Sequence, residues 1–263
     1  MTGWQALAVA AAGFVAGSIN AVVGSGTLVT FPVLLAVGLP PLSANISNSL
    51  GISAGNLTGV IGYRRELRGQ RWLLVRLLPA SILGALTGAF LLLHLPPASF
   101  ERIVPVLVGL AVVLVLVQPL VQRFVARRRA AAGVVTSEEL RIGSGRLSAL
   151  LAGAFGTGTY GGYFGASQGV MQIGIFGLLL PESLQRLNAL KNVLTLAVNS
   201  VAAVAYIVVA ADEVNWAAAG LIAGGSLVGG YVGASLGRRL PTPVLRGAIA
   251  ALGIVAIVVL VTR

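Results

Sequence analysis

Residues 18–40 read SINAVVGSGTLVTFPVLLAVGLP, an apolar run that Gly24-Ser25-Gly26-Thr27 interrupts near its middle. The run lies inside a longer stretch, Met1–Tyr63, that contains no Asp, Glu, Lys, Arg or His. A bilayer core about 30 Å thick is crossed by about 20 apolar residues of helix. The stretch is therefore too apolar for a water-facing surface and too long for one crossing, which predicts a helical membrane protein.

The composition of the whole chain supports this prediction. Hydrophobic residues make up 57% and charged residues 10%, whereas soluble domains carry about 25% charged residues. The net charge of +11 comes from Arg residues in short tracts at the ends of apolar segments, as in cytoplasmic loops. A basic face with interleaved aromatic residues is lacking, so we expect no nucleic-acid partner. The absence of Cys excludes disulfides, thiolate metal sites and Cys nucleophiles, and we expect no cofactor.

Six segments have the length of one membrane span, and two are longer. The six are 43–62, 72–93, 103–122, 187–209, 214–236 and 244–261. The longer segments, 4–38 and 147–181, are interrupted by small residues near Gly24-Ser25-Gly26-Thr27 and between Gly161 and Gly169. Glycine destabilises a helix interior by about 1 kcal/mol, and broken helices expose backbone groups that must be satisfied in hydrocarbon. We expect each segment to be a re-entrant hairpin of broken helices; one long tilted helix is the alternative.

The two halves of the chain repeat one another at an offset of 143 residues. Matched pairs include Gly26 with Gly169, Asn45 with Asn188, Asn56 with Asn199, and Tyr63 with Tyr206, and the same offset aligns Ser25 with Gln168. A polar, charged segment separates the halves. The predicted organisation is a first membrane repeat, 1–122, a cytoplasmic linker, 123–146, and a second membrane repeat, 147–263.

Charges in corresponding loops predict that the halves are inverted. The loop with Arg64, Arg65, Arg68 and Arg71 is strongly positive, and so is the loop 237–246, so both should be cytoplasmic. Their counterparts contain Asp212 and Glu213 in one case and are nearly neutral in the other. Inverted repeats with glycine-interrupted helices in matching positions are typical of secondary transporters, with the site at the interruptions. The motifs Gly84-x-x-x-Gly88 and Gly229-x-x-x-Gly233 predict close helix packing.

Neutral hydrogen-bond donors follow both interruptions, and they suit a small oxyanion. Asparagines spaced by three and four residues share one face of a helix, and a helix N-terminus attracts anions. The alternative is that they bind helices to one another, which we favour for Asn56 and Asn199. The predicted substrate-binding residues are Ser25, Gly26, Asn45, Asn48, Ser49, Gln168, Gly169, Asn188, Lys191 and Asn192.

Lys191 is the only lysine, and it opens an apolar helix. An ionisable residue inside a membrane segment predicts function; the alternative is that its side chain reaches the headgroups, since Arg186 is near in sequence. The apolar segments contain no acids and no clustered His for a metalloprotease, and no base near a serine. We therefore expect no catalytic residues and no enzyme.

Several motifs together resemble the sulfite exporter TauE/SafE family, also described as toluene-sulfonate uptake permeases. They are the Gly/Ser interruption, the run from Phe31-Pro32 to Pro40-Pro41, Ala44-Asn45-Ile-Ser-Asn48-Ser49, Gly59-Val-Ile-Gly-Tyr63-Arg64-Arg65, and Arg186-Leu-Asn188-Ala-Leu-Lys191-Asn192. The family's run of four or more glycines is here only Gly24-Ser25-Gly26. The resemblance covers nearly the whole chain apart from the linker. It implies transport of sulfite or small organosulfonates such as sulfoacetate, often by export.

The expected function is thus a secondary transporter or permease for small sulfur-containing anions, working by alternating access in the cell membrane. An anion channel, or a permease for another small organic anion, is the alternative. All seven acids lie in loops or at loop edges, so a buried proton relay is not predicted, and Glu182 is the one carboxylate candidate. The expected partners are a small anionic substrate and the lipid bilayer; glycine-rich faces leave a homodimer open.

Overall fold

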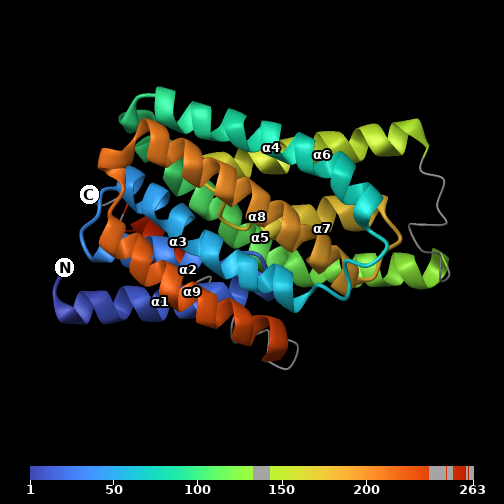
Figure 1. Ribbon diagram of the computed structural model, residues 1–263, viewed down its shortest axis with the longest axis horizontal. Helices are drawn as coiled ribbons and strands as arrows, with labels where there is room; N and C mark the ends of the chain where they lie inside the picture. Colours follow the sequence, from blue (N-terminus) through green and yellow to red (C-terminus); the bar gives the residue numbers. More distant parts are fainter. Residues whose placement is uncertain (133–142, 237–246, 248–250, 259, 261–263) are drawn as a thin grey trace.

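The computed structural model describes residues 1–132, 143–236, 247, 251–258 and 260. All regular structure in these residues is helical, as predicted. The α-helices are α1 (Gly3–Val22), α2 (Thr27–Ala36), α3 (Pro41–Gly62), α4 (Arg71–His94), α5 (Pro97–Ala132), α6 (Ser144–Tyr163), α7 (Gln168–Leu179), α8 (Leu184–Val209) and α9 (Trp216–Leu236). A short 3-10 helix, η1 (Ala211–Glu213), precedes α9. Figure 1 shows the long helices running side by side along one axis.

Both long apolar segments are broken helices, so the alternative of one tilted helix is wrong. Residues 23–26 separate α1 from α2, and residues 164–167 separate α6 from α7. Each break turns at a glycine with positive φ, +84° at Gly24 and +77° at Gly165. Glycine adopts this conformation without the steric cost of a Cβ. The sequence predicted the breaks correctly, although each first arm is about twice as long as the second.

The two broken helices are hairpins that open toward opposite sides of the bundle. In Figure 1, α1 starts at the side of the N-terminus and the chain returns to that side after α2; α6 starts at the other side, to which the chain returns after α7. Helices α3 and α8 run in opposite directions. This arrangement is what inverted halves require. The inverted repeat itself stays a prediction, because the predicted span 244–261 lies partly outside the described residues.

The correspondence between the two breaks corrects the predicted alignment. Gly24 and Gly165 are 141 residues apart, as are the N-cap residues of α2 and α7, Gly26 and Ser167. Helix α7 has 12 residues and α2 has 10, and these two extra residues restore the offset of 143 by Asn45 and Asn188. Gln168 therefore corresponds to Thr27, and its alignment with Ser25 is wrong.

Glycines let the long helices approach closely, as the two Gly-x-x-x-Gly motifs predicted. A Cβ added at Gly229 of α9 would lie 1.9 Å from the carbonyl oxygen of Phe14 in α1. In the other half, a Cβ at Gly84 of α4 would lie 2.2 Å from the carbonyl oxygen of Phe155 in α6. The first arm of each hairpin thus packs against a helix of the opposite half.

Five helices are long and apolar enough to cross a membrane within the described residues: α1, α4, α5, α8 and α9. Helices α3 and α6 have 22 and 20 residues, a length close to that of one crossing, but both are rich in Asn, Ser, Thr or Gly. Helix α5 continues to Ala132, ten residues into the predicted linker 123–146. The predicted domain boundaries are not tested by the fold and stay predictions.

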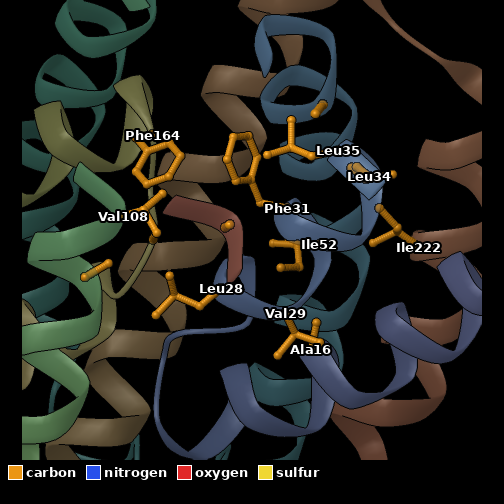
Figure 2. Close-up of a cluster of buried hydrophobic side chains, with 14 of the residues drawn as sticks. Ala16, Leu28, Val29, Phe31, Leu34, Leu35, Ile52, Val108, Phe164 and Ile222 are labelled. Atoms are coloured by element: carbon orange, nitrogen blue, oxygen red, sulfur yellow. The ribbon is translucent and has the colours of Figure 1, made fainter. Parts of the chain in front are cut away.

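The main hydrophobic core surrounds the short helix α2, in which eight of ten residues are buried. Figure 2 shows Phe31 of α2 facing Phe164, which follows α6, with Val108 of α5 beside it. The two rings meet edge to face, with centroids 5.4 Å apart and planes at 89°. This packing holds the second arm of one hairpin against the break of the other.

Candidate functional site

The two hairpins meet at their breaks. The backbone amide of Gly169, at the start of α7, donates a hydrogen bond of 3.3 Å to the carbonyl oxygen of Gly24. A Cβ added at Gly169 would lie 2.7 Å from the Cα of Gly24, and one at Gly24 would lie 2.6 Å from the Cα of Gly169. Only two glycines allow this backbone contact, which brings the predicted site segments of both halves together.

The side chains of Asn45 and Asn48, in the first turns of α3, bind both hairpins. Asn48 accepts a hydrogen bond from the hydroxyl of Thr30, and its Nδ2 donates to Thr27 Oγ1 at 3.2 Å. Asn45 Nδ2 donates to the carbonyl oxygen of Tyr163 at 3.0 Å. Helix α3 therefore contacts the start of α2 on one side and the end of α6 on the other.

Lys191, in α8, is buried against the end of α1. Its side chain is 1% exposed, so the alternative that it reaches the headgroups is wrong. Its Nζ donates to the carbonyl oxygens of Asn20 at 2.9 Å and Ala21 at 3.5 Å, and Asn192 Nδ2 donates to Ala21 at 3.3 Å. These carbonyls belong to the last turn of α1, where the helix carries a partial negative charge. Lys191 thus supplies a hydrogen-bond donor and a C-terminal cap directly at the break.

Asn20 is a site residue that the sequence reasoning missed. Its Oδ1 accepts from the backbone amide of Gly26 at 3.3 Å, and its Nδ2 donates to Asn56 Oδ1. It is 7% exposed. The available signal was a single asparagine in an apolar helix, one turn before the glycine break. The bond to Asn56 fits the interpretation of Asn56 as a residue that holds helices together.

Several buried polar atoms around the breaks have no hydrogen-bond partner among the described residues. They are Ser25 Oγ, Nε2 and Oε1 of Gln168, Nε2 of Gln172, and Oδ1 of Asn188. Buried polar groups are nearly always hydrogen-bonded, so this group of unpaired donors and acceptors makes the breaks a candidate site for a polar ligand. The side chain of Gln168 fits there because Gly161 lacks a Cβ, which would lie 2.4 Å from Oε1.

All ten residues of the predicted site are buried, but they are not all equally close to the breaks. Hydrogen bonds connect Asn45, Asn48, Lys191 and Asn192 to the hairpins. Ser25, Gly26, Gln168 and Gly169 form the breaks or directly follow them. Asn188 lies one turn before Asn192 in α8, and Ser49 is buried in α3, directly after Asn48. That these residues bind substrate stays a prediction.

Hydrogen bonds connect the two halves of the chain at both ends of the bundle. At one end, Ser43 Oγ of α3 donates to Glu213 Oε2 at 2.5 Å. At the other, Gln70 Nε2 donates to the carbonyl oxygen of Arg186 at 3.2 Å, and Arg186 Nη1 donates to the carbonyl oxygen of Arg68 at 2.8 Å. Glu182, the carboxylate singled out in the sequence, is 3% exposed and forms an ion pair of 2.6 Å with Arg186. Its position therefore indicates a structural role at the start of α8.

The arrangement defines a class: a multi-pass helical protein of the cell membrane with a buried, donor-rich centre between two broken hairpins. The chain belongs to the sulfite exporter TauE/SafE family, whose model matches residues 9–260. It is 27% identical over 229 residues to the probable membrane transporter protein YfcA of Escherichia coli K12, covering 86% of this chain and 76% of that one. A probable membrane transporter protein of Haemophilus influenzae is 33% identical over 100 residues, covering 36% of this chain and 38% of that one. No solved structure matches the chain. The protein is a membrane transporter, in agreement with the family resemblance of its motifs.

Proposed function

We propose that the protein is a secondary transporter for small sulfur-containing anions, sulfite or organosulfonates such as sulfoacetate, and that it exports them by alternating access around the two breaks. One observation carries the proposal: the unpaired donors of Ser25 and Gln168 lie at breaks that Lys191 contacts. The family description supplies the substrate class.

The chemistry of the donors fits an oxyanion. Sulfite and sulfonate oxygens accept hydrogen bonds, and hydroxyl, amide and ammonium groups donate them. Bonds in which one partner is charged are about twice as strong as neutral ones. None of the seven carboxylates lies in the breaks, so an entering anion meets no fixed negative charge there.

The burial of the centre supports alternating access over an open pore. All ten predicted site residues are buried, and protein contacts lie at both ends of α3, at Ser43 and beyond Gly62. A transporter needs such an occluded state between its two open states. Because the two hairpins open to opposite sides, movement of one hairpin against the other would expose the site first to one side of the membrane and then to the other.

The test is anion flux into proteoliposomes that contain the purified protein, with sulfite, sulfoacetate, sulfate and chloride compared. Wild type should show saturable flux of sulfite or a sulfonate. Asn48→Ala and Lys191→Ala should lower it about tenfold or more, since a hydrogen bond to a charged group contributes about 1.5–3 kcal/mol. Ser235→Ala is the matched control, because Ser235 is exposed and bonds only within its own helix.

Two outcomes would contradict the proposal. If folded protein carries none of the sulfur oxyanions, the substrate assignment is wrong. If flux rises linearly with chloride and does not saturate, the protein is an anion channel.

A further inference from the structure

The start of α4 forms a cavity that the transport site does not use. Gly69, with φ of +77°, turns the chain into the helix at Arg71. A surface cavity of about 440 Å³ lies here, lined by Gly69, Arg71, Trp72, Val75 and Arg76. Figure 1 shows α4 along the outer edge of the bundle, so the cavity lies on the surface that faces the membrane or its boundary.

The exposed face of α4 is apolar beyond this cavity. Val75, Leu83, Leu86 and Phe90 are 63%, 59%, 47% and 57% exposed, and they recur at helical spacing in a candidate membrane span. In a bilayer this stripe contacts lipid chains. Arg76 is exposed beside Val75 at the start of the stripe, about 7.5 Å along the helix from Arg71. The two arginines therefore bracket the boundary between headgroups and hydrocarbon.

The arginines of the cavity have no ion-pair partner in the part of the chain that the structure describes. The Arg76 guanidinium lies 5.1 Å from the ring centroid of Trp72, and its Nη1 donates to the Trp72 carbonyl oxygen at 3.4 Å. Among the described residues, no carboxylate forms an ion pair with Arg71 or Arg76. The Arg76 guanidinium lies against the Trp72 ring, and its remaining N–H groups have no partner among the described residues.

We propose that this cavity binds the phosphodiester headgroup of an anionic phospholipid. Guanidinium groups match the geometry of phosphate oxygens, tryptophan is typical of the membrane boundary, and basic residues there attract anionic lipids by about 1 kcal/mol each. Val75 gives the acyl chains an apolar contact next to the phosphate. A free phosphate ion would use the arginines but gain nothing from that contact.

The test is lipid retention by the purified, delipidated full chain in detergent, titrated with phosphatidylglycerol or phosphatidylcholine and read by native mass spectrometry. Wild type should retain about threefold or more phosphatidylglycerol than phosphatidylcholine, since basic residues at the membrane boundary attract anionic headgroups. Arg71→Ala with Arg76→Ala should remove this preference. Arg65→Ala is the matched control: it removes an equal, exposed charge from the preceding turn, and Arg65 does not line the cavity. A melting curve confirms that each variant is folded.

Three results would overturn the proposal. Equal retention of both lipids would show that the net negative charge of the headgroup is not recognised. If Arg65→Ala reduces the preference for phosphatidylglycerol equally, the lipid is attracted by the general positive charge of this region and is not bound in the cavity. Stabilisation by inorganic phosphate that depends on Arg71 and Arg76, without lipid retention, would identify a free-phosphate site.

Discussion

At the residue scale, Lys191 combines a structural and a functional contact. Its aliphatic stem passes Gly169, where an added Cβ would lie 2.7 Å from Lys191 Cδ, and its amine binds the last carbonyls of α1. A bound anion could share this amine only if Lys191 also stayed near the break. We therefore expect the capping bonds to position the charge for the substrate.

Lys191→Met should separate these contributions when it is compared with Asn192→Leu. Both variants remove a donor to the carbonyl oxygen of Ala21, but only the first removes an ionisable group. Asn192→Leu should lower the free energy of unfolding by about 0.5–1.5 kcal/mol, the usual contribution of one hydrogen bond. Lys191→Met should lower it by about 1–3 kcal/mol, because it also removes the side-chain donor to the carbonyl oxygen of Asn20. Sulfite flux per folded molecule should fall further in Lys191→Met than in Asn192→Leu. Equal flux in the two variants would show that Lys191 is a cap alone.

At the element scale, α3 and α8 make equivalent contacts at opposite ends of the bundle. Ser43 contacts Glu213, and Arg186 contacts Gln70. The offset of 143 residues maps Ser43 onto Arg186 and Gln70 onto Glu213. Under the proposed alternating access, these two contacts close the two ends of the same path.

The chain contains no cysteine, so a single introduced thiol can test whether these two contacts close opposite ends of the path. In a Ser25→Cys background, the introduced thiol is the only one in the chain and replaces a residue that is 1% exposed. Adding Ser43→Ala should raise its labelling by a membrane-impermeant thiol reagent applied from outside. Adding Gln70→Leu should raise labelling from the cytoplasmic side, because each variant releases one end only. Labelling that increases from the same side in both variants would contradict the two-ended arrangement.

Helix α9 offers a matched pair of glycines for testing close packing. A Cβ at Gly229 would meet the backbone of Phe14 at 1.9 Å, whereas one at Gly224 meets nothing within 4 Å. Gly229→Ala should destabilise the protein by about 1–3 kcal/mol or more, because backbone cannot yield as a side chain does. Gly224→Ala should be neutral or stabilising by up to about 1 kcal/mol, since alanine favours helix. Thermal unfolding in detergent measures both, and similar melting temperatures would refute the packing.

At the scale of the whole molecule, the sequence predicted the helical membrane fold and the two breaks, whereas the substrate-binding residues stay a prediction. These depend on local properties: the length of apolar runs and the glycines that interrupt them. The offset of 141 at the breaks could not be predicted, because closely spaced glycines match equally well at either offset. Neither could the role of Asn20, whose partners Gly26 and Asn56 are fixed by tertiary packing. Helix α5 ends later than the predicted span 103–122, because its charged last turns remain helical beyond the apolar core.

The two ends of α3 allow the predicted orientation of the protein in the membrane to be stated in terms of particular loops. Helix α3 has 22 residues and is therefore about 33 Å long. Glu213 contacts its first turn at Ser43, and the basic turn with Arg64 and Arg65 follows its last residue. The acidic and basic loops thus lie about one bilayer apart, which is the condition for the positive-inside rule to place them on opposite faces.

Single cysteines at Asp212 and Arg65 should report these faces, since the chain offers no other thiol. Both positions are exposed. In intact cells, Asp212→Cys should react with an impermeant maleimide, and Arg65→Cys should react only after permeabilisation. The reverse pattern would invert the orientation and leave the fold unchanged. Reaction of both in intact cells would contradict the crossing by α3, and with it the separation on which alternating access depends.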